Sequence, residues 1–287
     1  MKIGVRLSAA AVFVVVTAAA QIPRTPDGHP DFQGLWTNAT LTPVERPPRL
    51  AGNANLVDFF HLELRDGEGE QDHGSALASI NGVERSSLVV DPPDGKIPLR
   101  AARVPEHSRF DSVRDRPLSE RCLMGFGAPA GPPMLPVLDN SNYQIVQTPD
   151  YVMIMVEMVH DVRIVRMNGM HPPQNVRQWM GDSIGHWEGD TLIVDTTNFT
   201  SKTRFRGASQ DMHVIERFTR GTGEDAGAFL YKATIDDPAT FSKPWTMEYP
   251  FLATAGPIFE YACHEGNYAL ADILGGARKE DAGTGKR

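Results

Sequence analysis

From residue 143 onward, short apolar runs alternate with polar residues and end at turn-forming residues. Runs of this length and period predict strands of an antiparallel sheet. The predicted strands are Tyr143–Thr148, Tyr151–His160, Val162–Met167, Ile184–Trp187, Thr191–Thr196, His213–Thr219, Phe229–Ile235, Trp245–Tyr249 and Phe259–Cys263. An open sheet of so many short strands would expose its edges, whereas a sheet closed into a barrel has none. The pattern therefore predicts an all-β, mainly antiparallel, closed or partly closed barrel.

Residues 21–142 have a different pattern, because prolines and glycines interrupt their apolar runs. Proline cannot continue a helix interior or a central strand, so this segment is predicted to be irregular and to wrap the barrel. Within it we expect an amphipathic helix over Asn55–Arg65 and short strands over Gln33–Thr37 and Ser87–Val90. After the barrel strands, Tyr268–Lys279 has the pattern of a closing helix.

The first twenty residues have the pattern of a secretory signal peptide. Lys2 and Arg6 give a cationic start, a short apolar run follows, and the segment ends in Ala18-Ala19-Ala20. The apolar run is too short to span a membrane as a helix, which needs about 20 residues.

The predicted parts are the signal peptide (1–20), the irregular segment (21–142), a barrel domain (143–280) and a disordered tail (281–287). We therefore expect a periplasmic or secreted protein with no membrane insertion after cleavage.

The net charge bears on the expected binding partners, and the cysteine content bears on the expected disulfide bonds. The net charge is −8, and loss of Lys2 and Arg6 with the signal peptide brings it to −10 (−8 − 2). No basic stripe offsets this charge, so nucleic acid is not an expected partner. The two cysteines, Cys122 and Cys263, are predicted to form a disulfide in an oxidising compartment. Two separate buried thiols are the alternative.

Two resemblances to known families add to this pattern. Gly34-Leu35-Trp36, on the first predicted strand, resembles the G-x-W signature of lipocalins, whose barrel holds a small apolar ligand. Longer strings resemble a family of uncharacterised exported bacterial proteins over most of the mature chain. These strings are Pro26–Asp31, Trp179–Ser183, Trp187–Thr191 and Ala262–Asn267. The resemblance implies a lipocalin-like (calycin-type) barrel, and it implies no activity and no catalytic residues.

The chain lacks the short motifs of several enzyme classes. It contains no G-x-S-x-G, no H-E-x-x-H, no phosphate-binding G-x-x-x-x-G-K-[ST] and no paired C-x-x-C. Nucleotide cofactors are scarce outside the cytoplasm, so no cofactor is expected. The sequence therefore predicts a small-molecule enzyme that uses acid–base chemistry, namely a lyase, isomerase or hydrolase. A non-catalytic periplasmic binding protein for a small apolar ligand and an interaction module of the cell envelope are the alternatives.

His160, His213 and His264 lie on or at the end of predicted strands, whereas the other six histidines, His171 and His186 among them, are predicted to lie on the surface. We expect His160, His213 and His264 to carry protons. Asp161, Glu216 or Glu260 would orient them. This hypothesis requires the three histidines to converge in one cavity. Because they come from three separate strands, their spacing gives no support for a shared metal site.

Strand alternation leaves the orientation of Glu216 open. His213 shares one face with Arg217, and Glu216 lies on the opposite face with Phe218. An inward Glu216 would need a partner or a raised pKa, whereas an outward one would form a cross-strand salt bridge. Alternation also places Glu260 and His264 opposite Cys263 in the last predicted strand.

Three further residues are predicted to contact the ligand. Arg163 follows His160 and Asp161 closely and would bind an anionic or carbonyl group. Trp179 and Tyr249 belong to the aromatic and methionine-rich part of the chain, where such side chains line adaptable pockets. Filling of the core is the alternative role for these two.

Overall fold

A computed structural model describes residues 22–47, 76–100, 112–125, 130–137, 140–203, 205–222 and 225–284. The predicted signal peptide (1–20) and the predicted helix over Asn55–Arg65 lie outside these residues. The strands are β1 (Gly34–Thr37), β2 (Ser79–Ile80), β3 (Val83–Glu84), β4 (Val89–Asp91), β5 (Asn142–Gln147), β6 (Tyr151–Val156), β7 (Val162–Met167), β8 (Asp182–Glu188), β9 (Thr191–Thr197), β10 (His213–Arg220), β11 (Ala228–Asp236) and β12 (Trp245–Ala253). The described helices are the 3₁₀ turns η2 (Val113–Asp115), η3 (Met158–His160) and η4 (Phe205–Gly207), and the α-helix α2 (Ala269–Thr284).

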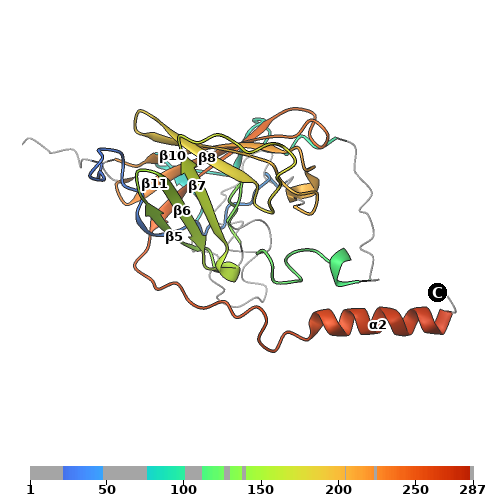
Figure 1. The fold of residues 1–287 in the computed structure, drawn as a ribbon. Coiled ribbons are helices and arrows are strands. Elements are labelled where there is room, and N and C mark those ends of the chain that lie inside the picture. Colours follow the sequence, from blue (N-terminus) through green and yellow to red (C-terminus); the bar gives the residue numbers. More distant parts are fainter. Residues whose placement is uncertain are drawn as a thin grey trace, which may run out of the picture.

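Nine strands close into a barrel in the order β1-β5-β6-β7-β8-β9-β10-β11-β12 (Figure 1). β1 closes the ring because Trp36 pairs with Tyr143 of β5 on one side and with Ala253 of β12 on the other. β4 pairs with the opposite end of β12, near Thr246. The prediction of an all-β barrel is confirmed, and its closing strand β1 corresponds to the short strand predicted over Gln33–Thr37 in the otherwise irregular segment.

One pair of neighbouring strands runs parallel, whereas all other neighbours in the barrel are antiparallel. Val165 of β7 pairs with Ser183 of β8 in parallel register. A parallel pair needs a long crossover instead of a tight hairpin. Residues 168–181 provide this crossover, and they place several polar side chains against the outside of the barrel.

Aromatic side chains fill much of the barrel interior. Trp36 meets Phe229 edge-on at 4.8 Å between ring centroids, and Phe229 stacks on Phe251 at 4.7 Å. Edge-on and offset arrangements of this kind are the favoured aromatic contacts. The proline-rich residues 130–135 are also buried against this core.

Two predicted strands end differently in the structure. The strand predicted over Tyr151–His160 stops at Val156, because Val159 and His160 adopt positive φ values of 59° and 51° and turn the chain into β7. The strand predicted over Phe259–Cys263 is wrong, since this segment is a loop. The physical reason is that β11, β1 and β4 already occupy the edges of β12, so the segment cannot turn back and pair with the strand that precedes it.

The predicted closing helix is present as α2, which lies apart from the barrel at the end of a long loop (Figure 1). It continues to Thr284, so the prediction of a disordered tail from residue 281 is wrong for residues 281–284. No helix in the described ranges is both long and apolar enough to cross a membrane.

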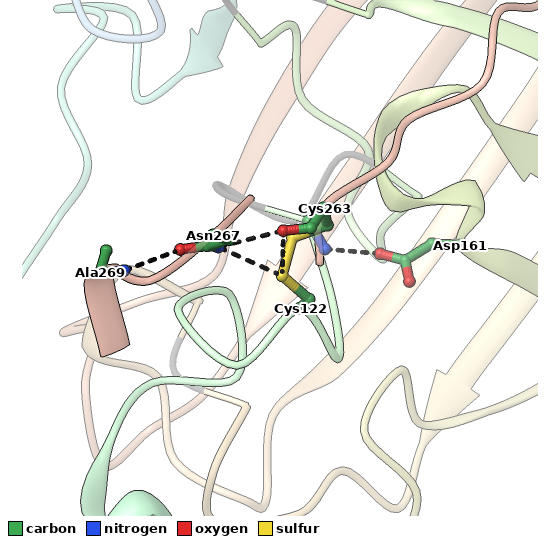
Figure 2. The surroundings of a disulfide bond; sticks show 6 residues. Cys122, Asp161, Cys263, Asn267 and Ala269 are labelled. Atoms are coloured by element: carbon green, nitrogen blue, oxygen red, sulfur yellow. Dashed lines mark hydrogen bonds between the residues drawn. A yellow bond between two sulfur atoms is a disulfide. The ribbon is translucent and has the colours of Figure 1, made fainter. Parts of the chain in front are cut away.

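The predicted disulfide joins Cys122 to Cys263 (Figure 2), and no free cysteine remains. Around it, Asn267 donates to the Cys263 carbonyl at 3.0 Å, and Gly125 N–H donates to Asp161 at 2.7 Å. The bond therefore attaches the loop after β12 to the N-terminal half of the chain. The alternative of two separate thiols is wrong.

Replacing both cysteines, Cys122→Ser with Cys263→Ser, should lower the free energy of unfolding. The bond closes a loop of 141 residues. For a loop of that length the chain-entropy model gives a loss of about 5 kcal/mol. Urea unfolding followed by circular dichroism measures this loss, and reduced wild-type protein is the matched control. The prediction would be contradicted if the double variant and reduced wild type both unfolded at the same urea concentration as oxidised wild type.

Candidate functional site

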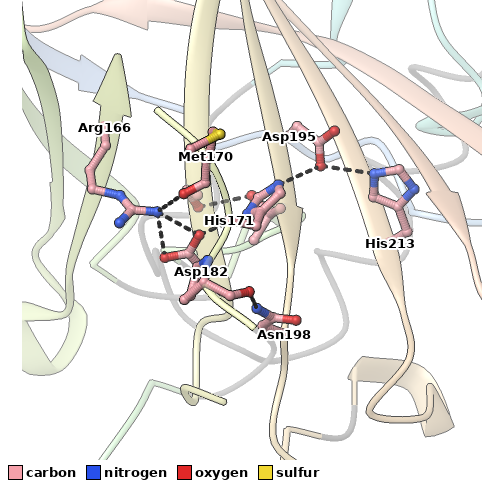
Figure 3. Close-up of polar contacts among 10 residues, drawn as sticks. Arg166, Met170, His171, Asp182, Asp195, Asn198 and His213 are labelled. Atoms are coloured by element: carbon pink, nitrogen blue, oxygen red, sulfur yellow. Dashed lines mark hydrogen bonds and ion pairs between the residues drawn. The ribbon is translucent and has the colours of Figure 1, made fainter. Parts of the chain in front are cut away.

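A chain of charged side chains crosses the outer faces of β7, β8, β9 and β10 (Figure 3). Asp182 accepts hydrogen bonds from Arg166 at 2.8 Å and pairs with His171 Nδ1 at 2.7 Å. His171 Nε2 lies 3.3 Å from Asp195 Oδ1, and His213 Nε2 lies 2.9 Å from the same oxygen. His171, His213, Asp182 and Asp195 thus form one hydrogen-bonded chain, which we call the outer histidine cluster.

Strand register places Asp182, Asp195 and His213 on the same outer face, and the crossover adds His171. Asp195 lies opposite Ile184 of β8 and Ile215 of β10, so its side chain points outward beside His213. Asp182 precedes Ile184 by two residues and therefore shares the same outer face. The parallel crossover brings His171 between the two carboxylates, where its side chain is only 22% exposed.

The Asp195–His213 pair alters the pKa of both groups. The hydrogen bond to Asp195 raises the pKa of His213 and outweighs partial burial, which lowers it. Partial burial raises the pKa of Asp195, but the hydrogen bonds and charges of His213 and His171 outweigh it, so the net pKa is lowered. Nδ1 of His213 has no hydrogen-bond partner among the described residues, and the side chain is 43% exposed. Asp195 thus fixes one ring nitrogen and leaves the other accessible to solvent.

A surface groove of about 420 Å³ begins at the same place, and we call it the β7 groove. Its lining includes the apolar Val162, Ile164, Trp179 and Met180, and also the charged Arg163, Arg177 and Asp182. The groove forms because β7 and β8 pair only from Val165 onward, which leaves the first residues of β7 without a neighbour on β8. Its apolar wall and the outer histidine cluster therefore share Asp182.

The structure places two predicted site residues together inside the barrel. Both terminal nitrogens of Arg163 bind the Glu216 carboxylate, at 2.6 and 3.0 Å, and both side chains are almost fully buried. Tyr231 donates to the same carboxylate at 2.7 Å. Burial alone lowers the pKa of Arg163, but the charge of Glu216, its hydrogen bonds and the charges of Tyr231 and Tyr143 together outweigh burial and raise the pKa. Glu216 points inward, so the alternative of an outward salt bridge is wrong, and it does not orient His213.

Tyr249 also lies inside the barrel rather than in the β7 groove. It is fully buried and donates to the carbonyl of Met134 at 2.8 Å. Burial raises its pKa well above the usual value, so the hydroxyl stays neutral and acts as a donor.

The remaining predicted residues lie near the loop that follows β12. His160 is exposed, and its Nε2 lies 3.2 Å from the carbonyl oxygen of Phe259. Asp161 accepts from Gly125 N–H instead of orienting His160, and burial raises its pKa.

His264 and Glu260 are exposed in this loop. Glu260 and Cys263 line a second pocket of about 580 Å³ beside α2. His213, in contrast, belongs to the outer histidine cluster. The three predicted histidines therefore do not form one site, and the hypothesis that they act together is dropped.

Sequence reasoning missed Asp195, Asp182, Arg166 and His171. Asp195 could have been found, because it is a charged residue at an outward position of the strand next to His213. His171 could not, since its place depends on the path of the crossover, which has no short-range pattern.

The described residues contain no group of three or more His, Cys, Asp and Glu side chains that could hold a metal ion. No protein-family model matches the chain, and neither the curated proteins nor the solved structures contain a match. The function of the protein is therefore inferred from the geometry of the site itself.

Arg163→Met should destabilise the protein strongly, because it leaves the buried Glu216 carboxylate without its cation. Removing one partner of such a pair costs about 3–5 kcal/mol. Adding Glu216→Gln removes the buried charge and keeps an acceptor for Tyr231, so the double variant should recover most of the loss. Thermal and urea unfolding of the three proteins measure both effects. A single variant as stable as wild type would contradict this account of the barrel interior.

Proposed function

We propose that the protein is an exported enzyme that acts on a small molecule by acid–base chemistry at the β7 groove. The carrying observation is the Asp195–His213 pair, in which a carboxylate holds Nε2 at 2.9 Å and leaves Nδ1 accessible. A histidine oriented in this way transfers protons efficiently near neutral pH. The Asp195 carboxylate also stabilises the imidazolium that forms after proton abstraction.

Each neighbouring residue has a separate role in this proposal. The apolar wall formed by Val162, Ile164 and Trp179 binds the body of the substrate. His171 and Arg166 are positioning residues, because they hold the two carboxylates through the contacts at 2.7, 2.8 and 3.3 Å. His213 exchanges the proton with the reacting end of the substrate, beyond Asp182. The reaction class is a lyase, isomerase or hydrolase without a nucleotide cofactor.

Export remains part of the proposal, and two observations support it. The first twenty residues have the pattern of a signal peptide. The Cys122–Cys263 disulfide is compatible with an oxidising compartment outside the cytoplasm.

Ligand binding without catalysis is the second candidate function, because four apolar side chains lie side by side in the lining of the groove. Val162, Ile164, Trp179 and Met180 would bind a small apolar molecule whether or not a proton moves. Substitution of His213 distinguishes the two functions, because it would leave such binding intact.

Hydrogen–deuterium exchange at carbon tests the enzyme proposal without knowledge of the natural substrate. Aromatic ketones and α-keto acids are incubated with the protein in D₂O, and deuterium in the position next to the carbonyl is measured by NMR. Wild type should accelerate this exchange for at least one compound. His213→Ala should reduce the acceleration by about 10²–10⁴-fold, the usual contribution of a general base.

His160→Ala and His264→Ala are matched controls, because both remove an exposed histidine outside the outer histidine cluster. They should retain the wild-type rate. Equal loss in all three variants, or full activity in folded His213→Ala, would exclude the proposed role of His213. A groove that binds these compounds without any exchange would favour the binding protein.

A further inference from the structure

A second polar network lies inside the barrel and shares no residue with the outer histidine cluster. Its central link is the peptide backbone of Met134, which is held by two tyrosine hydroxyls. Met134 N–H donates to Tyr231 Oη at 2.9 Å, and Tyr249 Oη donates to the Met134 carbonyl at 2.8 Å. The two hydroxyls thus present one acceptor and one donor, which together match an amide group.

The network continues from each tyrosine to a polar side chain that is more than nine-tenths buried. Tyr231 donates to Glu216, which is paired with Arg163. Asn38 donates to Tyr249 at 3.3 Å on the other side. At the two ends, Arg163 Nε and Asn38 Oδ1 are buried without a hydrogen-bond partner among the described residues. Buried polar atoms are satisfied in most proteins, so these two atoms indicate an incomplete set of partners.

The segment that supplies the amide, residues 130–135, is held to the barrel by side chains. Among the described residues, the backbone of 130–137 forms no backbone–backbone hydrogen bond. Its attachment comes from burial of residues 130–135, from the two tyrosines, and from the Ser141 hydroxyl, which accepts from the N–H of Val137 and donates to its carbonyl. Withdrawal of the segment would break no strand pairing and would leave an acceptor and a donor facing the vacated space.

We propose that Tyr231 and Tyr249 form a binding site for a small amide-bearing molecule, and that the Met134 peptide occupies this site when the ligand is absent. The ligand amide would accept from Tyr249 and donate to Tyr231, and further polar groups on it would satisfy Asn38 Oδ1 and Arg163 Nε. Apolar substituents of the ligand would replace the buried side chain of Met134. This site does not require His213.

Occupation by Met134 lowers the apparent affinity for such a ligand. A ligand must bind the fraction of molecules in which residues 130–135 have withdrawn, and its apparent dissociation constant rises as that fraction falls. A change that weakens the segment but keeps both hydroxyls should therefore tighten binding.

Calorimetric titration with N-acetyl-L-methionine methylamide, which mimics the Met134 peptide, tests the site. Met134→Ala should bind this probe at least tenfold more tightly than wild type. Adding Tyr231→Phe and Tyr249→Phe should abolish that gain, because the hydroxyls are lost while the cavity left by the methionine remains. Met158→Ala is the matched control, since it truncates a buried methionine of η3 and should show no gain.

Two outcomes would overturn the proposal. One is a cooperatively folded Met134→Ala protein that binds the probe no better than wild type. The other is equal binding by the tyrosine double substitution, which would show that the cavity alone attracts the probe. If Met134→Ala does not fold, hydrogen exchange of wild type decides instead. Millimolar probe should raise exchange in residues 130–137 but not in the barrel strands, and unchanged exchange there would exclude the site.

Discussion

All four residues of β1 pair with β5 on one side, and Trp36 and Thr37 also pair with β12 on the other. This double pairing closes the ring and determines what the barrel encloses. Once the ring is closed, every strand has a fixed inner and outer face, because side chains alternate along each strand. A shift of one residue in any pair would exchange those faces. Closure also explains why the segment after β12 does not pair back onto that strand, since β11 and β1 already flank it.

The alternation separates two kinds of polar chemistry on β10. Glu216 points inward and is neutralised by Arg163, as a charge in a barrel interior requires. His213 points outward, where Asp195 holds one ring nitrogen and the other is accessible. The inner pair is shielded from solvent and contributes to a buried network. The outer pair, in contrast, is partly exposed. We therefore assign the proposed proton transfer to the outside of the barrel.

Local sequence patterns predicted the barrel well because strands and turns depend on neighbouring residues. They also predicted the partnership of the two cysteines, which depends on their number and the compartment. They failed where long-range packing decides the outcome. The alternating segment Phe259–Cys263 cannot pair back onto β12, whose edges β11, β1 and β4 occupy. His171 reaches Asp182 and Asp195 only through the parallel crossover. The predicted set of three histidines failed for the same reason, because residues on separate strands meet only if the register brings them together.

The pH dependence of turnover tests the central claim most directly, because the claim concerns one proton on His213. As a base, His213 must be neutral, so activity should rise as pH increases through its raised pKa. Asp195→Asn removes the carboxylate that raises this pKa, although the charge of Asp236 still contributes. The account predicts that the rising limb of the profile moves to lower pH in Asp195→Asn and that maximal activity falls. An identical profile in the two proteins would contradict it.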